Sequence, residues 1–425
     1  MTATVERVEP APVVESVADR RRRNRNGVLL GFVALVAVVL AVTTKPGTVT
    51  FRLSGQFAET PLNLALPAQP LAWIGAVVAV AVAVLYVLQK LPARWAWVLW
   101  ALLATTFIFT FLSWAASGKV FPLTNQFQGT MSFATPLILG ALAGVLCERS
   151  GVINVAIEGQ FLVGAFAAAV FATVFGNAYV GMIAAIGGGV LIAALLAVFS
   201  IRYLVNQVVL GVVLVVFATG ITGFLFDQFV QDDASAFNNP DVLQAIPIPL
   251  LSDIPVIGDV LFRQTILVYA MYAAVAIVTY VLFKTRWGLR VRAVGEHPRA
   301  ADTVGINVLR VRYQAVLLGG VFAGLGGAFF TVGFGGSFNK DMTAGNGFIA
   351  LAALIMGRWH PVGATLAALF FGFATQLQSQ LQIIDTPIPG DVLLMAPYLA
   401  TIIAVAGLVG RVRAPKADGE PYVKS

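Results

Sequence analysis

The feature that most constrains this chain is the recurrence of apolar segments long enough to cross a lipid bilayer. A helix needs about 20 predominantly apolar residues to span a hydrocarbon layer of about 30 Å. Twelve segments approach that length, at residues 28–44, 71–89, 96–114, 130–147, 152–175, 179–200, 205–228, 264–284, 314–333, 345–357, 361–380 and 391–410. Only 11% of the residues are charged, against about 25% in soluble proteins. The sequence therefore predicts an all-α fold, a polytopic transmembrane helical bundle of about 10–12 spans.

The segment at 345–357 is too short to cross the membrane alone, so its length predicts either a re-entrant half-helix or one part of a broken span. The first segment follows an arginine cluster, as in a signal peptide. It lacks a small-residue cleavage site, and further spans follow, so it is predicted to be a retained span.

The distribution of basic residues predicts the orientation. If the N-terminus is inside, the outside loops hold only five of the 27 Lys and Arg residues, and the inside loops and tails hold the other 22. The five are Lys45, Arg52, Lys119, Arg263 and Lys340. Because Lys and Arg accumulate in cytoplasmic loops, both termini are predicted to be cytoplasmic. The net charge of +7 then reflects topology, and nucleic acid is not an expected partner.

Four parts are predicted along the chain. Residues 1–26 form a disordered, basic cytoplasmic tail, and residues 27–129 form the N-terminal spans. The core follows at 130–411 and includes a basic cytoplasmic loop at 285–313, and a short cytoplasmic tail at 412–425 ends the chain.

The sequence lacks the motifs of an enzyme. No G-x-x-x-x-G-K-[ST] phosphate loop is present, since Gly118–Lys119 is followed by Val120. The only histidines, His297 and His360, lie in separate loops, and a single cysteine accompanies them, so no metal site is expected. We predict no catalytic residues and no cofactor bound by this chain.

Glu158 is the main ionisable residue at membrane depth. An ionised carboxylate at a helix centre costs about 2.5–3.5 kcal/mol on insertion scales, so it tends to face a cavity or a partner. Asn154 and Glu158 are four residues apart and are predicted to share a helix face, whereas Gln160 points elsewhere. Asn154, Glu158 and Gln160 are predicted to belong to a translocation pathway. A structural contact between packed helices, or a solvated carboxylate at the interface, remains an alternative.

The loop at 285–313 contains a short predicted helix. Pro298 suits a first helical turn, Ala300, Ala301 and Val304 follow with helical spacing, and Gly305 ends the segment. A small apolar face of this kind can dock into a groove on another protein. The alternative is an amphipathic turn held on anionic membrane lipid by neighbouring arginines.

Two stretches carry a family resemblance. Residues 295–306 resemble the coupling-helix signature of permease subunits of bacterial ABC importers, although Arg299 stands where the usual Glu-Ala-Ala-x-x-x-Gly pattern has glutamate. Residues 148–160 are similar to the signature of the simple-sugar and nucleoside branch, which includes ribose-type and branched-chain amino acid permeases. The resemblance covers about 130–410. It implies ATPase-coupling roles for Gly295, Glu296, His297, Pro298, Arg299, Ala300, Ala301 and Gly305.

The resemblance also implies partners and a substrate. A multi-pass permease in the bacterial plasma membrane is expected to import nucleosides, or a simple sugar such as ribose. The expected partners are a second homologous permease, a cytoplasmic ABC ATPase that binds ATP and Mg²⁺, and an extracytoplasmic substrate-binding lipoprotein. The acidic outside loop at 229–263 is then either a landing surface for that lipoprotein or an ordinary solvated connector. The alternative function is an ion-coupled secondary transporter in which Glu158 carries the ion.

Overall fold

The computed structural model describes residues 17–55, 62–88, 96–384, 386, 388–395 and 413–424. These residues form two compact units. The N-terminal unit takes the described residues of Met1–Arg52, Leu62–Phe121 and Ile384–Ile388, and the main unit takes those of Leu53–Pro61, Pro122–Ile383 and Pro389–Ser425. The division falls shortly before the predicted boundary at residue 129.

The N-terminal unit contains three long helices, α1 (Val17–Thr43), α2 (Ala68–Val87) and α3 (Ala96–Ala115). Its core is lined largely by alanines, which let α1 and α2 approach closely. A small sheet of order β2-β1-β3 joins them, formed by Thr48–Arg52 (β1), Asn63–Pro67 (β2) and Val120–Pro122 (β3). The prediction of disorder through residue 26 is wrong from Val17 onward, because the arginine cluster, which has high helix propensity, extends α1. Residues 1–16 lie outside the described residues.

The main unit is also mostly helical. Its long helices are α4 (Leu123–Glu148), α5 (Ile157–Phe175), α6 (Ala178–Ala197), α7 (Gln207–Leu225), α9 (Ile266–Lys284), α12 (Val308–Ala328) and α14 (Pro361–Ile383). Shorter elements are α8 (Ala234–Phe237), α10 (Arg286–Glu296), α11 (Pro298–Thr303), α13 (Asn346–Met356) and the paired strands β4 (Ile246–Pro247) and β5 (Arg263–Gln264). Single π-helical turns extend α6, α7 and α12 at Val198–Arg202, Phe226–Val230 and Phe329–Gly333, and another lies at Gly258–Phe262.

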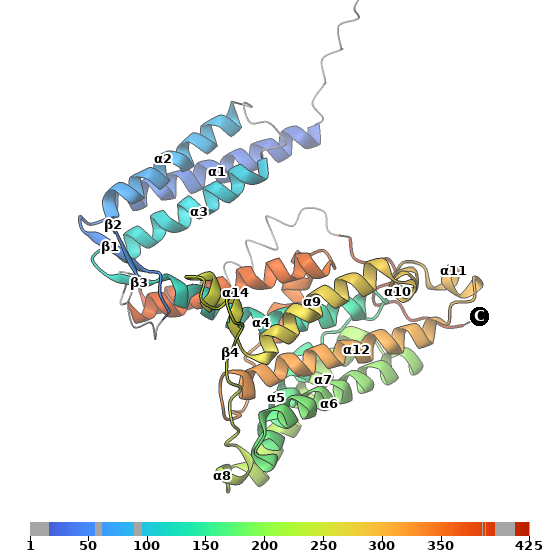
Figure 1. The fold of residues 1–425 in the computed structure, drawn as a ribbon. Coiled ribbons are helices and arrows are strands. Elements are labelled where there is room, and N and C mark those ends of the chain that lie inside the picture. Colours follow the sequence, from blue (N-terminus) through green and yellow to red (C-terminus); the bar gives the residue numbers. More distant parts are fainter. Residues whose placement is uncertain are drawn as a thin grey trace, which may run out of the picture. The chain divides into compact units, whose positions relative to one another are not determined.

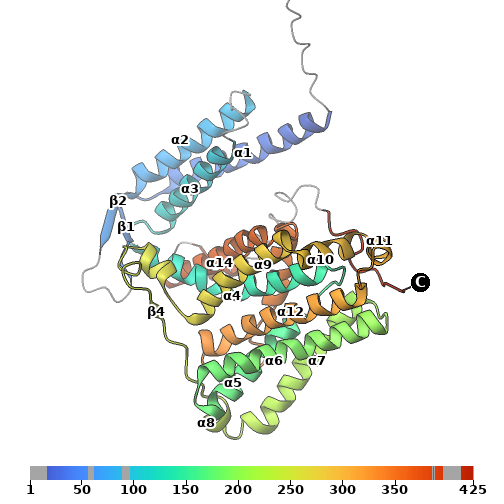
Figure 2. The ribbon, with the colours of Figure 1, turned by 45° about the vertical axis from the view of Figure 1, so that its right-hand side comes forward.

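Glycines set the closest helix contacts of this unit. Helix α12 packs along α5 and α6, and α4 packs against α14 and α12 (Figures 1 and 2). A Cβ atom at Gly189 of α6 would lie 2.4 Å from the carbonyl oxygen of Gly320, and one at Gly324 would lie 2.3 Å from that of Ala185. The Gly320 and Gly324 pair, spaced four apart in the sequence, therefore mediates tight helix packing, as its spacing indicates.

Nine helices within the described part of the chain are long and apolar enough to cross a membrane. They are Asn24–Thr43, Ala68–Val87, Val98–Ala115, Leu123–Glu148, Ile157–Phe175, Ala178–Arg202, Gln207–Val230, Ile266–Lys284 and Val308–Gly333. Helix α13 has only 11 residues, as its length in the sequence predicts. Most of the predicted span at 391–410 lies outside the described residues. The helical membrane fold is confirmed, and the cytoplasmic placement of both termini stays a prediction.

The two ends of the main unit differ. Helices α10 and α11 lie at one end together with the C-terminus of the chain, whereas α8 lies at the opposite end (Figure 1). We call the first of these the coupling end, defined by α10, α11 and the residues that contact them.

Candidate functional site

The carboxylate of Glu158 binds the N-terminal end of α13. Its Oε1 accepts hydrogen bonds from Thr343 Oγ1 at 2.6 Å and from the Gly345 N–H at 2.8 Å. Its Oε2 accepts from the Gly347 N–H at 2.5 Å. The side chain is only 4% exposed. A helix N-terminus presents unpaired N–H groups and a partial positive charge, so the buried carboxylate compensates the start of a helix too short to span the membrane.

Glycines bring α13 to Glu158. Gly345 precedes the helix with φ +82°, a conformation that disfavours other residues. A Cβ atom at Gly347 would lie 2.4 Å from the Glu158 backbone nitrogen, so only glycine permits this approach. The sequence identifies Glu158 but not its partners, which lie 185 to 189 residues further along the chain.

Asn154 and Glu158 do not share a helix face, which corrects the sequence-based expectation. Helix α5 begins at Ile157, and Asn154 lies in the turn after α4. Gly151 in that turn has φ +88°, which breaks the helix that the apolar pattern appeared to continue. The Asn154 amide instead donates to Gln160 Oε1 at 3.2 Å.

We call Asn154, Gln160 and Gln207 the amide cluster, because Asn154 bonds Gln160 and Gln207, the first residue of α7, bonds the main chain next to Asn154. All three side chains are at most 3% exposed. Gln207 Oε1 accepts from the Ile153 N–H at 2.7 Å, and so holds the turn against α7. Within the described residues Asn154 Oδ1, Gln160 Nε2 and Gln207 Nε2 have no hydrogen-bond partner. The cluster therefore has one acceptor and two donors that the described residues leave unpaired.

A second polar zone, on α4 and α14, is absent from the sequence-based prediction. Gln126 is 1% exposed and donates to the Phe373 carbonyl at 3.2 Å. Gln376 occupies the space that the missing side chain of Gly129 leaves, and Gln380 is buried one turn beyond it. The alternation of glutamines from residue 376 to 382 is the signal that could have identified this zone, because buried polar residues in membrane helices are costly and tend to be functional.

The structure divides the predicted apolar face of α11. Ala301 is 4% exposed and belongs to the core of the main unit, whereas Ala300 and Val304 are exposed, Val304 to 75%. The expectation of one face with three residues is wrong because Ala300 and Ala301 are adjacent and point about 100° apart on a helix. The face left for a partner consists of Ala300 and Val304. Gly305 follows with φ +83° and is exposed.

The other predicted coupling residues lie around α10 and the start of α11. Gly295 is buried, and a Cβ atom there would lie 2.2 Å from the Arg149 carbonyl oxygen. Glu296, His297 and Arg299 are exposed, and Pro298 occupies the first turn of α11 as predicted. Through Gly295, α10 therefore touches the same turn that carries Asn154.

Arg149 links this turn to the connection between α13 and α14. Its Nε donates to the Trp359 carbonyl at 2.8 Å. His360 stacks on Phe283, with ring centroids 4.8 Å apart. Burial, and then the charge of Arg149, lower the pKa of His360, so its ring is neutral near pH 7. The coupling end thus contacts the turn that carries Asn154 and, through Arg149, the connection between α13 and α14.

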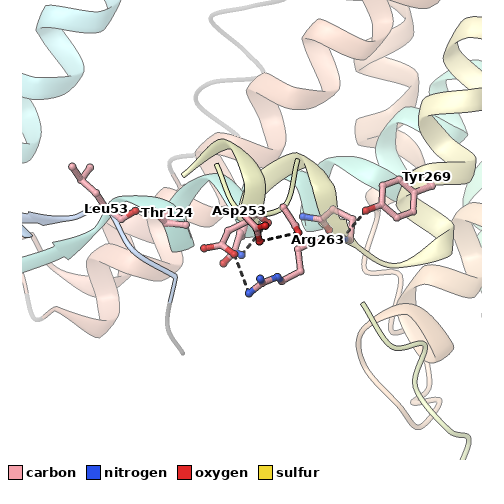
Figure 3. Close-up of polar contacts among 9 residues, drawn as sticks. Leu53, Thr124, Asp253, Arg263 and Tyr269 are labelled. Atoms are coloured by element: carbon pink, nitrogen blue, oxygen red, sulfur yellow. Dashed lines mark hydrogen bonds and ion pairs between the residues drawn. The ribbon is translucent and has the colours of Figure 1, made fainter. Parts of the chain in front are cut away.

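The acidic loop at 229–263 is partly folded. Strands β4 and β5 pair, and the Tyr269 hydroxyl donates to the Ile246 carbonyl at 2.8 Å. Asp259 forms an ion pair with Arg263 at 3.3 Å, and its carbonyl accepts from the side chain of Gln128 of α4. Figure 3 shows Arg263 and Tyr269 among the polar contacts of this region. Leu250 is 84% exposed with φ +68°. The loop therefore exposes the apolar side chain of Leu250, while hydrogen bonds and an ion pair hold other parts of the loop in place.

Comparison with known proteins assigns the family. Residues 126–409 match the family described as branched-chain amino acid transport system / permease component. The guanosine ABC transporter permease protein NupQ of Bacillus subtilis (strain 168) is 42% identical over 304 residues, which cover 69% of this chain and 95% of that protein. The nucleoside ABC transporter permease protein NupC of Lactococcus lactis subsp. cremoris (strain MG1363) is 43% identical over 303 residues, with the same two coverages.

A putative glucose ABC transporter permease protein of Haloferax volcanii is 33% identical over 302 residues, which cover 67% of this chain and 91% of that protein. No solved structure matches the chain. The family match runs from within α4 to beyond α14 and includes Glu158, the amide cluster, α10 and α11. The chain belongs to the ABC transporter permease family, as a membrane component that is not itself the ATPase.

Proposed function

We propose that this chain is the permease subunit of an ABC importer that moves nucleosides into the cell. The observation that carries the proposal is the identity of 42% and 43% to two relatives whose names specify guanosine and nucleosides, over 95% of each relative's length. A simple sugar such as ribose is the second candidate substrate, because a more distant relative is named for glucose.

The pathway proposal rests on the polar groups inside the main unit. Asn154 and Gln160, together with Gln207, offer free amide donors and an acceptor at one level of the bundle. Nucleoside bases and sugar hydroxyls pair with groups of this kind. Glu158 contributes by fixing α13 beside α5, and its three donors support this positioning role.

The coupling proposal assigns α10 and α11 to the contact with a cytoplasmic ABC ATPase, which binds ATP and Mg²⁺. The exposed Ala300 and Val304 form the small apolar face that enters a groove on that partner. Orientation with both termini in the cytoplasm is part of this proposal, since it places α11 on the ATPase side. Substrate is delivered on the opposite side by an extracytoplasmic binding lipoprotein, for which the loop with Leu250 is the proposed landing surface.

A second, homologous permease completes the proposed complex. Bacillus subtilis also has a guanosine ABC transporter permease protein NupP, which is 27% identical to this chain over 300 residues. Two different guanosine permeases in one organism support a pair of related but non-identical subunits. Copurification of the tagged chain from its native membrane tests this stoichiometry.

The function is tested with the purified complex of permeases, ATPase and binding protein in proteoliposomes. We expect the proteoliposomes to take up radiolabelled guanosine or another nucleoside. This uptake should require ATP on the side of the membrane where the ATPase is bound, and a protonophore should not inhibit it. A thermal-shift screen of the binding protein against nucleosides and sugars identifies the substrate. Uptake that is abolished by the protonophore and independent of ATP would instead support the ion-coupled secondary transporter.

A further inference from the structure

The C-terminal segment Arg413–Lys424 packs onto the coupling end instead of extending into solvent. It lies beyond the family match, which ends at residue 409. Ala417 is 2% exposed and Tyr422 is 7% exposed. Chain termini are ordinarily poorly ordered unless specific contacts hold them. Figures 1 and 2 both show the C-terminus beside α11.

The first contact joins the segment to α10. The Ala417 N–H donates to the Gly295 carbonyl at 2.9 Å, one of the last carbonyls of α10. The Ala417 carbonyl approaches the turn after α4 so closely that a Cβ atom at Gly151 would lie 2.9 Å from it. Gly419, with φ +77°, packs over Ile153 of the same turn. The segment therefore contacts both α10 and the turn that carries Asn154.

The second contact is with Arg312 of α12. This arginine is only 1% exposed, and its Nη1 donates to the Glu420 carbonyl at 3.0 Å. Its Nε and Nη2 have no hydrogen-bond partner within the described residues. A buried guanidinium requires acceptors, so the main-chain oxygen of Glu420 supplies part of what makes burial of Arg312 possible.

The third contact reaches α11 from its inner side. The Tyr422 hydroxyl lies beside the Asp302 carboxylate, and burial, followed by this carboxylate, raises the pKa of Tyr422. The Tyr422 ring belongs to the same buried cluster as Ala301 and Val308. The outer side of α11, with Ala300 and Val304, stays free. The segment thus supports α11 on the side opposite to the proposed ATPase contact.

We propose that Arg413–Lys424 is a brace that couples α11 to the membrane helices. This inference rests on the proposed function, because it takes the exposed face of α11 as the ATPase contact. Helix α11 has six residues and is joined to its neighbours by short loops. Without the brace, displacement of α11 by the ATPase is absorbed by local movement. With the brace, the displacement reaches α12 through Arg312 and the amide-cluster turn through Gly151.

The test compares chains within the full complex in proteoliposomes. One variant ends at residue 412, a second carries Tyr422→Ala and a third carries Tyr422→Phe, which removes only the hydroxyl contact. Val423→Ala is the matched control, because Val423 is adjacent and 67% exposed. For each we measure permease insertion, ATPase stoichiometry, basal and substrate-stimulated ATP hydrolysis, and nucleoside uptake per ATP hydrolysed.

We expect the truncated chain and Tyr422→Ala to lower uptake per ATP by about tenfold or more, since each loses buried contacts with α11. Tyr422→Phe should give a smaller loss, and Val423→Ala should match the wild type. Loss of the ATPase from the truncated complex also supports the brace. Normal uptake per ATP in the truncated chain overturns the brace proposal. If truncation prevents insertion, normal uptake per ATP in Tyr422→Ala overturns the proposal instead. A full-length chain that never binds an ATPase overturns the proposed function instead.

Discussion

Replacing Glu158 by glutamine tests whether the carboxylate holds the start of α13. Both oxygens of Glu158 are acceptors, and together they receive three hydrogen bonds. A glutamine keeps one oxygen and presents an NH₂ group in place of the other. In either orientation this NH₂ group meets a backbone N–H, of Gly345 or of Gly347, and that N–H loses its acceptor.

The expected cost follows from two contributions. A buried N–H left without a partner costs about 1–3 kcal/mol. Loss of a negative charge at a helix N-terminus costs about 0.3–2 kcal/mol. The substitution should therefore weaken the closed position of α13 by about 1–5 kcal/mol. Because about 1.4 kcal/mol is a factor of ten, the open population rises by about fivefold to a few thousandfold.

The assay is hydrogen exchange of the peptide spanning residues 343–349, combined with uptake in the reconstituted complex. Glu158→Gln should speed exchange at Gly345 and Gly347 and lower uptake while the complex still assembles. Gly347→Ala is a matched variant that keeps the charge but pushes α13 away from the Glu158 backbone. It should speed exchange in the same peptide. Thr343→Ser, which keeps the hydroxyl donor, should behave as the wild type.

Two results would refute parts of this reasoning. Wild-type exchange in Glu158→Gln would mean that the carboxylate does not hold α13. Wild-type uptake in both Glu158→Gln and Glu158→Ala would reduce Glu158 to a tolerated residue outside the pathway. Lower uptake without faster exchange would favour a direct pathway role over a positioning role.

Three further predictions concern topology, the coupling end and pH. In a chain whose single cysteine is replaced by serine, cysteines introduced at Asp241 and Pro298 should label from opposite sides of intact cells, Asp241 from outside; labelling from one side contradicts the topology. Ala300→Trp should release the ATPase or abolish stimulated hydrolysis with normal insertion, whereas Ala301→Trp should impair folding, because overpacking a core position costs about 1–3 kcal/mol; the reverse order contradicts the exposed face. Burial raises the pKa of the Asp418 carboxyl. Its protonation therefore stabilises docking of the C-terminal segment fully below the unfolded pKa of about 4, and this stabilisation is lost as the pH rises through the raised pKa of the folded state. Tryptic cleavage within the segment should accelerate over that range, relative to an exposed site elsewhere, and Asp418→Asn should flatten the change.

The apolar pattern predicts most of the fold. Hydrophobic length locates the spans, and Gly320 and Gly324 predict a tight helix contact, because in lipid these signals are local in sequence. The same pattern fails at the turn after α4. Ile153, Val155 and Ala156 are apolar and read as part of a span, although Gly151 ends the helix and α5 starts only at Ile157.

The site is less predictable because its contacts are long-range. The sequence singles out Glu158 as a costly buried charge but gives no indication that α13 supplies its donors. It identifies Ala300 and Ala301 as small, but only packing decides which of the two faces the core. In the sequence the C-terminal segment resembles a polar tail. Its packing is not predictable from its own residues, because the hydrogen bonds that hold it come from Gly295 and Arg312, which lie far away in the sequence.

The hydrogen bonds of Glu158 also have a consequence for biosynthesis. Thr343 follows Glu158 by 185 residues, a distance that takes roughly 10–40 s to synthesise at about 5–20 residues per second. Throughout that interval α5 carries an acidic side chain, while the residues that donate hydrogen bonds to it in the folded protein have not yet left the ribosome. The nascent chain must keep this group hydrated or near the lipid headgroups until α13 folds back against it. Glu158→Gln removes that early cost and weakens the finished protein, so its effects on yield and on transport should have opposite signs.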